Sequence, residues 1–187
     1  MTVKPFLKWV GGKRQLLADI LPLVPNEFSR YIEPFVGGGA VFFHLADQIN
    51  AQRIPNVIND INPELVNCYQ MVKTQTNDLI SLLKTHKYDK NYYLEIRNLD
   101  RQEGGLSVLS PLERASRFIY LNRTGFNGMY RVNSKGLNNV PFGRYKNPSI
   151  VNEDVLRASA KALIDTQISN QSFQDCLSNA GKGDFVY

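Results

Sequence analysis

The sequence predicts an α/β fold organised around a parallel sheet, and three adjacent features support this prediction. Residues 30–35 are predicted to form a short buried strand that enters a run of three glycines at positions 37–39. Residues 40–48 then repeat apolar side chains at helical spacing, and residues 56–60 form a second strand that ends in Asp60. This order predicts a right-handed βαβ unit, which we place at the edge of a Rossmann-like sheet.

Length and composition are those of one globular domain. The 187 residues are 43% hydrophobic and 21% charged, which is enough for a real core. The apolar runs are too short to span a membrane, and the first residues lack the apolar stretch of an export signal. Cys68 and Cys176 are isolated, so we expect two buried, reduced thiols and no metal site. We therefore expect a cytoplasmic protein with no membrane partner.

Helical periodicity accounts for much of the remaining chain. Helices are predicted over residues 13–24, 62–73, 76–87, 90–99, 110–122 and 152–164. Asn62 is a good N-cap with Pro63 at the first helical position. Ser110 and Glu113 have the spacing of a capping box. These local signals fix two of the helix starts.

The strands and helices together predict how the chain is divided. Residues 124–148 are rich in Gly, Asn and Pro, which predicts a loop or hairpin. Short strands are predicted over residues 168–173 and 184–187. We assign residues 1–61 and 149–187 to one domain that contains the sheet, and residues 62–148 to a helical insertion beside it.

Positive charge is concentrated in one segment. Residues 114–152 contain seven Lys and Arg and no Asp or Glu, so subtracting +7 from the net charge of +5 leaves about −2 elsewhere. Six aromatic residues are interleaved with these basic ones. A basic, aromatic segment of this kind is typical of a nucleic-acid surface, and the alternative is a solvated basic face over ordinary core aromatics.

The glycine run predicts a nucleotide-like ligand. Glycines allow the backbone to approach a ligand closely, and the helix that follows presents unpaired N–H groups. Asp60 lies 21 residues after Gly39, near the interval at which an acidic residue binds ribose hydroxyls. A purely structural turn is the alternative. Phe42 at the third glycine position of a dinucleotide fingerprint disfavours NAD, and Arg14 at the Ser or Thr position of a phosphate loop excludes that motif.

Four motifs give the chain a specific resemblance. They are FLKWVGGK at residues 6–13, EPFVGGG at 33–39, YLNRTGFNGMYRVN at 120–133 and NVPFGRYK at 139–146. In sequence and order they resemble the DNA adenine methylase (Dam) family of S-adenosylmethionine-dependent N6-adenine DNA methyltransferases, and most of all the members that recognise GATC. The resemblance implies that residues 1–61 and 149–187 bind the cofactor and that residues 62–148 recognise duplex DNA.

The resemblance also implies which side chains bind S-adenosylmethionine. They are Trp9, Lys13, Phe35, Gly37, Gly39 and Asp60. Lys13 would pair with the carboxylate of the methionine end, and Asp60 would accept from the ribose hydroxyls. Phe173, expected on the strand at 168–173, is a candidate to lie against the adenine ring, and its alternative is a plain core residue.

The DNA contacts implied by the resemblance lie in the basic segment. They are Arg123, Arg131, Asn133, Arg144 and Lys146. Arg131 and Asn133 can reach base edges, because Arg suits guanine and Asn suits adenine. Arg144 and Lys146 are expected to contact phosphates.

The catalytic residues of the family are not found in these 187 residues. The family presents a flipped adenine to an Asp-Pro-Pro-Tyr tetrad, which follows a strand resembling residues 184–187, and no such tetrad occurs here. We therefore expect an incomplete Rossmann-like sheet, no methyl transfer by this chain alone, and self-association through the sheet edge left by truncation. The alternatives are a non-catalytic DNA- or cofactor-binding protein and, far less favoured, an NAD-dependent oxidoreductase.

Overall fold

Four parallel strands form the sheet in the computed structural model, which describes residues 3–11 and 16–187. Their spatial order is β3 (Gln167–Ser169), β2 (Asn56–Asn59), β1 (Arg30–Glu33) and β4 (Asp184–Val186). The α/β class and the parallel sheet are confirmed. The placement of the βαβ unit at the sheet edge is wrong, because β3 pairs with the outer side of β2 and β4 with the outer side of β1.

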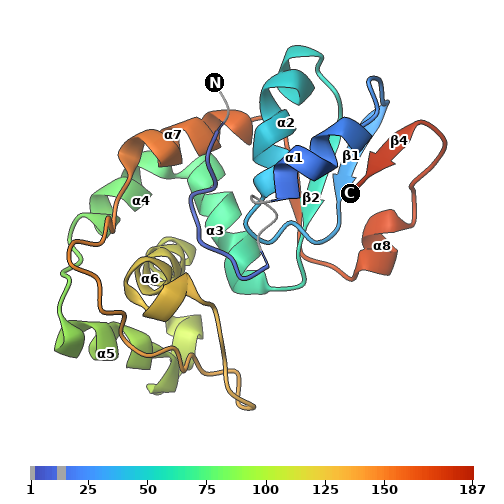
Figure 1. The fold of residues 1–187 in the computed structure, drawn as a ribbon. Helices are drawn as coiled ribbons and strands as arrows, with labels where there is room; N and C mark the ends of the chain where they lie inside the picture. Colours follow the sequence, from blue (N-terminus) through green and yellow to red (C-terminus); the bar gives the residue numbers. More distant parts are fainter. Residues whose placement is uncertain (1–2, 12–15) are drawn as a thin grey trace.

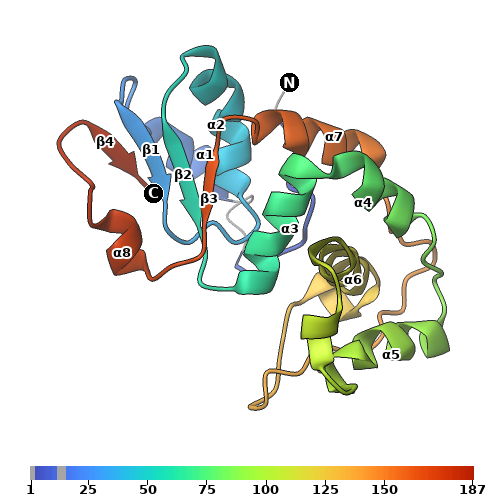
Figure 2. The ribbon, with the colours of Figure 1, turned by 180° about the vertical axis from the view of Figure 1, so that it is seen from behind.

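Helices surround this sheet and extend away from it (Figures 1 and 2). The α-helices are α1 (Leu17–Ile20), α2 (Ala40–Ala51), α3 (Pro63–Thr74), α4 (Thr76–Leu83), α5 (Lys90–Asn98), α6 (Pro111–Thr124), α7 (Glu153–Ala162) and α8 (Phe173–Leu177). Short 3-10 helices are η2 (Leu21–Leu23), η3 (Leu99–Arg101), η4 (Gly105–Val108) and η5 (Phe126–Gly128). In both views α3 stands between the sheet and the layer made by α4, α5 and α6.

The local signals placed two helix starts correctly. The Asn62 side chain accepts hydrogen bonds from the backbone N–H of Glu64 and Leu65, and this caps α3. At α6 the Ser110 hydroxyl accepts from the N–H of Glu113, while the Glu113 carboxylate accepts from the N–H of Ser110 at 2.8 Å. Each cap satisfies backbone donors that the first helical turn cannot pair internally.

Two expected elements differ from the structure. The helix expected over residues 13–24 is two short pieces, α1 and η2, and residues 13–15 lie outside the described part. Phe173 does not lie on a strand. It is the first residue of α8, because the Ser172 side chain accepts from the N–H of Asp175 at 3.1 Å and starts a helix there.

One continuous core joins the sheet to the helices. Phe42 and Phe43 from α2 belong to the same buried cluster as Tyr69 from α3, Leu79 from α4 and Phe118 from α6. A smaller cluster around Tyr93, Tyr120 and Leu121 fills the space between α5 and α6. The helices of residues 62–148 therefore share a core with the sheet, and the division into two domains stays a prediction.

The C-terminal strand is held to β1 by both backbone and side chains. Arg30 pairs with Asp184 at 2.5 Å, and the N–H of Tyr187 donates to the carbonyl of Ile32 at 3.0 Å. β4 is the outer strand on that side of the described sheet, and the self-association expected there stays a prediction. Across residues 3–11 and 16–187, no helix has the length and hydrophobicity needed to cross a membrane.

Candidate functional site

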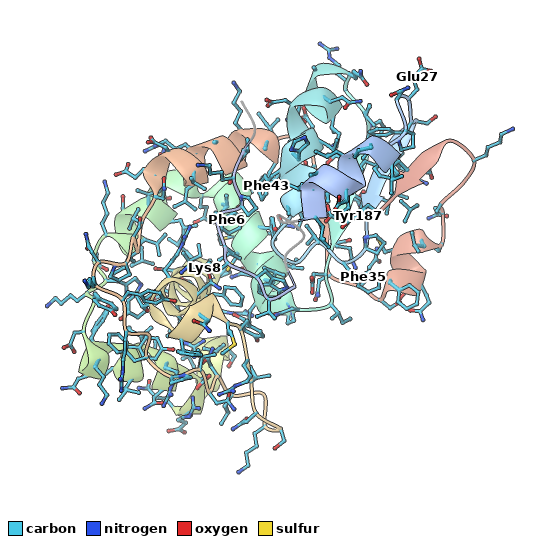
Figure 3. The ribbon with its side chains drawn as sticks, viewed as in Figure 1. Phe6, Lys8, Glu27, Phe35, Phe43 and Tyr187 are labelled. Carbon is cyan, nitrogen blue, oxygen red and sulfur yellow. The ribbon has the colours of Figure 1, made fainter. Side chains whose placement is uncertain are left out.

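A cleft of about 480 Å³ opens at the carboxyl ends of β1 and β2. The described residues that line it are Trp9, Val10, Gly11, Glu33, Phe35, Val36, Gly37, Gly38, Gly39, Ala40, Val41, Asp60 and Tyr187. Phe35, which follows β1, and Tyr187, which follows β4, border it and are labelled in Figure 3. Parallel sheets bind ligands at this edge, so the sequence and the topology indicate the same place.

The glycine loop, residues 37–39, has a conformation that side chains would disrupt. Gly37 and Gly39 have φ angles of +48° and +70°, in the left-handed region. A Cβ atom on Gly37 would lie 2.7 Å from Cδ1 of Trp9, and one on Gly39 would lie 2.7 Å from the Tyr69 hydroxyl oxygen. Gly39 then serves as the N-cap of α2. The loop therefore keeps bare backbone against Trp9 on one side and Tyr69 on the other.

Asp60 fastens the glycine loop to the start of α3. One carboxylate oxygen accepts from the N–H of Gly37 at 3.1 Å, and the other accepts from the N–H of Asn62 at 3.0 Å. The Tyr69 hydroxyl donates to the carbonyl of Gly37 at 2.9 Å. Each carboxylate oxygen has a second lone pair, so Asp60 can accept from a ligand hydroxyl while it holds the loop.

Two phenylalanines present apolar rings beside the cleft. Phe35 is 68% exposed and Phe173 is 44% exposed, and their ring centroids are 5.5 Å apart. Large apolar side chains left this exposed indicate a binding surface rather than core packing. Phe173 reaches this position from the start of α8.

Glu33 is a buried acid at the end of β1 that the sequence did not single out. Only 2% of the residue is exposed, and its carboxylate accepts from the Tyr31 hydroxyl at 2.7 Å. Burial raises the pKa of Glu33 to about 8, because the charged form loses its hydration. The signal for it in the sequence was an acidic residue that ends a predicted buried strand directly before Pro34.

Trp9 connects the cleft to the basic segment. Its ring stacks on Tyr130 with centroids 5.9 Å apart, and Tyr130 stacks on Phe118 at 5.0 Å. Asn122 holds the same junction, since its side chain donates to the carbonyls of Lys8 and Gly128 at 2.8 and 2.7 Å. The site side chain Lys13 lies outside the described residues.

Three of the seven basic residues in the segment are used inside the protein. Arg114 pairs with Glu64, and buried Arg117 pairs with Asp100 at 2.9 Å. Arg123, predicted to contact DNA, is half-buried and donates to the carbonyl of Phe6 at 2.7 Å. Part of the positive charge counted in the sequence is therefore structural.

The other four basic residues are exposed in the basic loop, residues 124–148. They are Arg131, Lys135, Arg144 and Lys146. Arg131 is oriented by Asn139, whose side-chain oxygen and carbonyl accept from it at 2.7 and 3.0 Å. Asn133, whose role in reading a base stays a prediction, closes the loop tip: its side-chain oxygen accepts from the N–H of Lys135 and Leu137, each at 3.0 Å.

Comparison with known proteins decides the family. The family model described as D12 class N6 adenine-specific DNA methyltransferase matches residues 9–187. The chain belongs to this family. It is 46% identical over 191 residues to the Type II methyltransferase M1.LlaDCHI of Lactococcus lactis subsp. cremoris, covering 100% of this chain and 65% of that protein.

Two further relatives also carry the names of methyltransferases or adenine methylases. The Type II methyltransferase M.MjaIII of Methanocaldococcus jannaschii is 39% identical, covering 100% of this chain and 68% of the relative. The DNA adenine methylase of Haemophilus influenzae is 37% identical, covering 98% of this chain and 62% of the relative. The chain thus spans about two thirds of the length of these curated relatives.

In this member of the D12 class, one further contact joins the N-terminal segment to the basic loop. The Lys8 ammonium lies 4.6 Å from the centre of the Tyr145 ring, a cation–π distance. Figure 3 shows Lys8 near the middle of the molecule, at the junction between the N-terminal segment and α6. Lys8 was visible in the sequence only as part of the first motif, because its aromatic partner lies far along the chain.

Proposed function

We propose that the chain forms the S-adenosylmethionine-binding and DNA-binding part of an enzyme that methylates the N6 amino group of adenine in duplex DNA, with a GATC-type target. The observation that carries the proposal is the position of Trp9. Its ring covers the glycine loop of the cleft and stacks on Tyr130 at the base of the basic loop. A cofactor site and a DNA surface that share one side chain suit a reaction between cofactor and DNA.

The cleft fits the chemical groups of S-adenosylmethionine. The bare backbone of Gly37 and Gly39 leaves room that a Cβ would fill. Asp60 would accept from the ribose hydroxyls, and the exposed rings of Phe35 and Phe173 offer apolar faces to the adenine. Lys13 is assigned to the methionine carboxylate from the family resemblance. When bound, the cofactor supplies the methyl group.

The buried Phe42 argues against a dinucleotide. It is 0% exposed, at the position where a dinucleotide-binding helix carries glycine to approach the strand closely. The first turn of α2 therefore carries a bulky buried residue, which leaves less room for a pyrophosphate.

The basic loop fits the groups of duplex DNA. Arg131 is exposed and its guanidinium is oriented, as a residue that contacts a guanine edge must be. Exposed Arg144 and Lys146 suit phosphates. For Asn133 to read adenine, it would have to exchange its bonds to the loop tip for bonds to the base. Arg123 keeps part of its guanidinium for such a contact while it anchors Phe6.

The transfer itself requires activation of a weak nucleophile. The lone pair of the adenine amino group is delocalised into the ring, and the family resemblance assigns its activation to an Asp-Pro-Pro-Tyr tetrad that these 187 residues do not contain. That they do not methylate DNA by themselves stays a prediction. A tritiated-methyl assay with adenine-containing duplex tests it, and incorporation by the mass-verified chain would overturn it. A DNA substrate agrees with the cytoplasmic location expected from the sequence.

Calorimetric titration with S-adenosylmethionine tests the cofactor assignment. We expect binding by the wild-type chain, weakened by about 1–3 kcal/mol in Asp60→Ala, because hydrogen bonds to a charged group are lost. NAD serves as the matched control ligand, since it also carries adenine and ribose. Equal affinity for NAD, or no binding of either ligand, would contradict the proposal.

A further inference from the structure

Glu33 is a buried acid in the cleft to which the proposed function gives no task. It lines the cleft, yet only 2% of the residue is exposed. Its hydrogen-bond donors are the Tyr31 hydroxyl at 2.7 Å and the backbone of Phe42. Burying a carboxyl group this deeply costs free energy unless a cation or several donors compensate for the lost water. A neutral carboxyl avoids most of that cost.

Among the residues that the structure describes, the groups that face Glu33 from neighbouring elements supply no positive charge. They are Tyr31 on β1, Tyr69 on α3, Tyr187 after β4 and Asp60 after β2. Burial raises the pKa of Tyr69 and of Tyr187, and the nearby Glu33 charge raises both further. Among the described lining residues, the carboxyl groups are those of Glu33 and Asp60, and no lysine or arginine is present. The described wall of the cleft thus favours a cation inside it.

We propose that Glu33 sets the charge preference of the cleft and favours the sulfonium cofactor over its uncharged thioether product. The inference rests on the proposed function, since it takes the ligand to be S-adenosylmethionine. The two molecules differ by one methyl group and one positive charge, and they share the adenine, the ribose and the amino acid end. Discrimination between them must therefore come from a group that responds to charge near the sulfur atom.

The response is a proton equilibrium. Burial raises the pKa of Glu33 to about 8, so the carboxyl is mostly protonated at pH 7 in the empty cleft. A sulfonium cation nearby lowers that pKa, and the proton leaves to solvent as the cation enters. The thioether has no charge, so the carboxyl keeps its proton. Each unit by which the cation lowers the pKa is a tenfold preference for the sulfonium form once Glu33 ionises.

The test compares the affinities of S-adenosylmethionine and S-adenosylhomocysteine by calorimetry between pH 6 and pH 8.5. We expect the wild-type preference for the sulfonium form to rise about tenfold across this range and then to level off above the pKa of Glu33. In Glu33→Gln the preference should stay flat, because the amide has similar shape and does not titrate. Repeating the titration at pH 7 in buffers of different ionisation enthalpy counts the protons released.

Two controls separate this inference from other effects. The amino group of both ligands also titrates, so the informative number is the proton release of the wild type minus that of Glu33→Gln. Asp60→Asn should weaken both ligands, because both carry the ribose, and leave the pH dependence of their ratio unchanged. Thermal unfolding followed by circular dichroism checks that each variant is folded. If Glu33→Gln is not, Tyr31→Phe takes its place: it removes the hydrogen bond that lowers the pKa of Glu33, so the rise in preference should move to higher pH.

Every outcome decides the inference. A preference that follows pH in the wild type, stays flat in Glu33→Gln and shifts to higher pH in Tyr31→Phe supports it. Binding of both ligands with the same ratio and the same proton release in wild type and Glu33→Gln overturns it and leaves the proposed function standing. Absence of binding by either ligand overturns the proposed function itself, and the inference with it.

Discussion

The glycine loop and the basic loop differ in how well their residue types predict where the side chains lie and what they contact. In the glycine loop, Asp60 accepts from the N–H of Gly37 at 3.1 Å, and Gly37, Gly39 and Asp60 line the same cleft. In the basic segment, Arg117 and Arg123 turn inward to Asp100 and to the carbonyl of Phe6. A left-handed backbone position admits few residues, whereas an arginine serves equally well in an ion pair or against a phosphate.

The basic loop depends on a buried acid, and removing it should have the largest effect. Asp100 accepts from Arg117 at 2.9 Å and from the N–H of Asn138 at 2.7 Å. Asp100→Ala leaves the Arg117 charge buried without its partner, so we expect a loss of about 3–5 kcal/mol in the free energy of unfolding by urea. The control is Glu153→Ala, whose pair with Lys84 is exposed and should contribute little to stability. Equal losses in the two variants would contradict this.

The glycine loop should respond to a single methyl group. Gly39→Ala places a Cβ 2.7 Å from the Tyr69 hydroxyl oxygen at a φ of +70°. Left-handed strain and overpacking together predict a loss of about 2–4 kcal/mol in unfolding free energy. Gly136→Ala in the basic loop is the matched control, since its φ is +74° and nothing lies within 4 Å of the added atom.

The Gly136→Ala control separates the cost of the contact with Tyr69 from the cost of left-handed backbone strain. Gly136→Ala should cost about 1–2 kcal/mol, the strain alone. If the two alanine variants lose the same stability in urea titration, the contact with Tyr69 contributes nothing and the comparison between the loops fails.

Local signals in the sequence predicted structure well, and long-range ones did not. The caps at Asn62 and Ser110 were correct because each involves neighbours within three residues. The same kind of signal at Ser172 was missed, and Phe173 was therefore placed on a strand instead of in α8. Asp100 and Arg117 are 17 residues apart and Glu64 and Arg114 are 50 apart, so no local pattern could reveal that these arginines are paired.

The pH dependence of stability should distinguish the buried acid of the cleft from the rest of the molecule. The folded-state pKa of Glu33 is about 8, above its usual value of 4.5. The folded chain thus binds more protons than the unfolded chain between these values, and the stability contributed by neutral Glu33 is lost as pH rises through that window. Glu33→Gln should flatten the dependence by about 1 kcal/mol per pH unit.

The measurement is urea unfolding of wild type and Glu33→Gln at several values between pH 5 and pH 8. His86 in the helical layer is the opposite case, because burial lowers its pKa to about 4. Its contribution is present above its usual value of 6.5 and is lost as pH falls toward 4. Parallel pH curves for the wild type and Glu33→Gln would show that the Glu33 carboxyl is already ionised in the folded chain.

The smallest expected effects separate phosphate contacts from base contacts in the basic loop. Arg144 and Lys146 are exposed, and each phosphate contact releases about one condensed counterion. Arg144→Ala and Lys146→Ala should therefore each lower the slope of log affinity against log salt by about 1 and leave sequence preference unchanged.

Arg131→Ala should instead relax base preference at one position by about 1–3 kcal/mol, because its oriented guanidinium is placed to read a base edge. Fluorescence anisotropy with matched and mismatched duplexes at several salt concentrations measures both quantities, and Lys135→Ala at the loop tip is the control for loss of one exposed charge. If Arg131→Ala changes only the salt slope, as Lys135→Ala should, Arg131 contacts phosphate and the division within the basic loop is wrong.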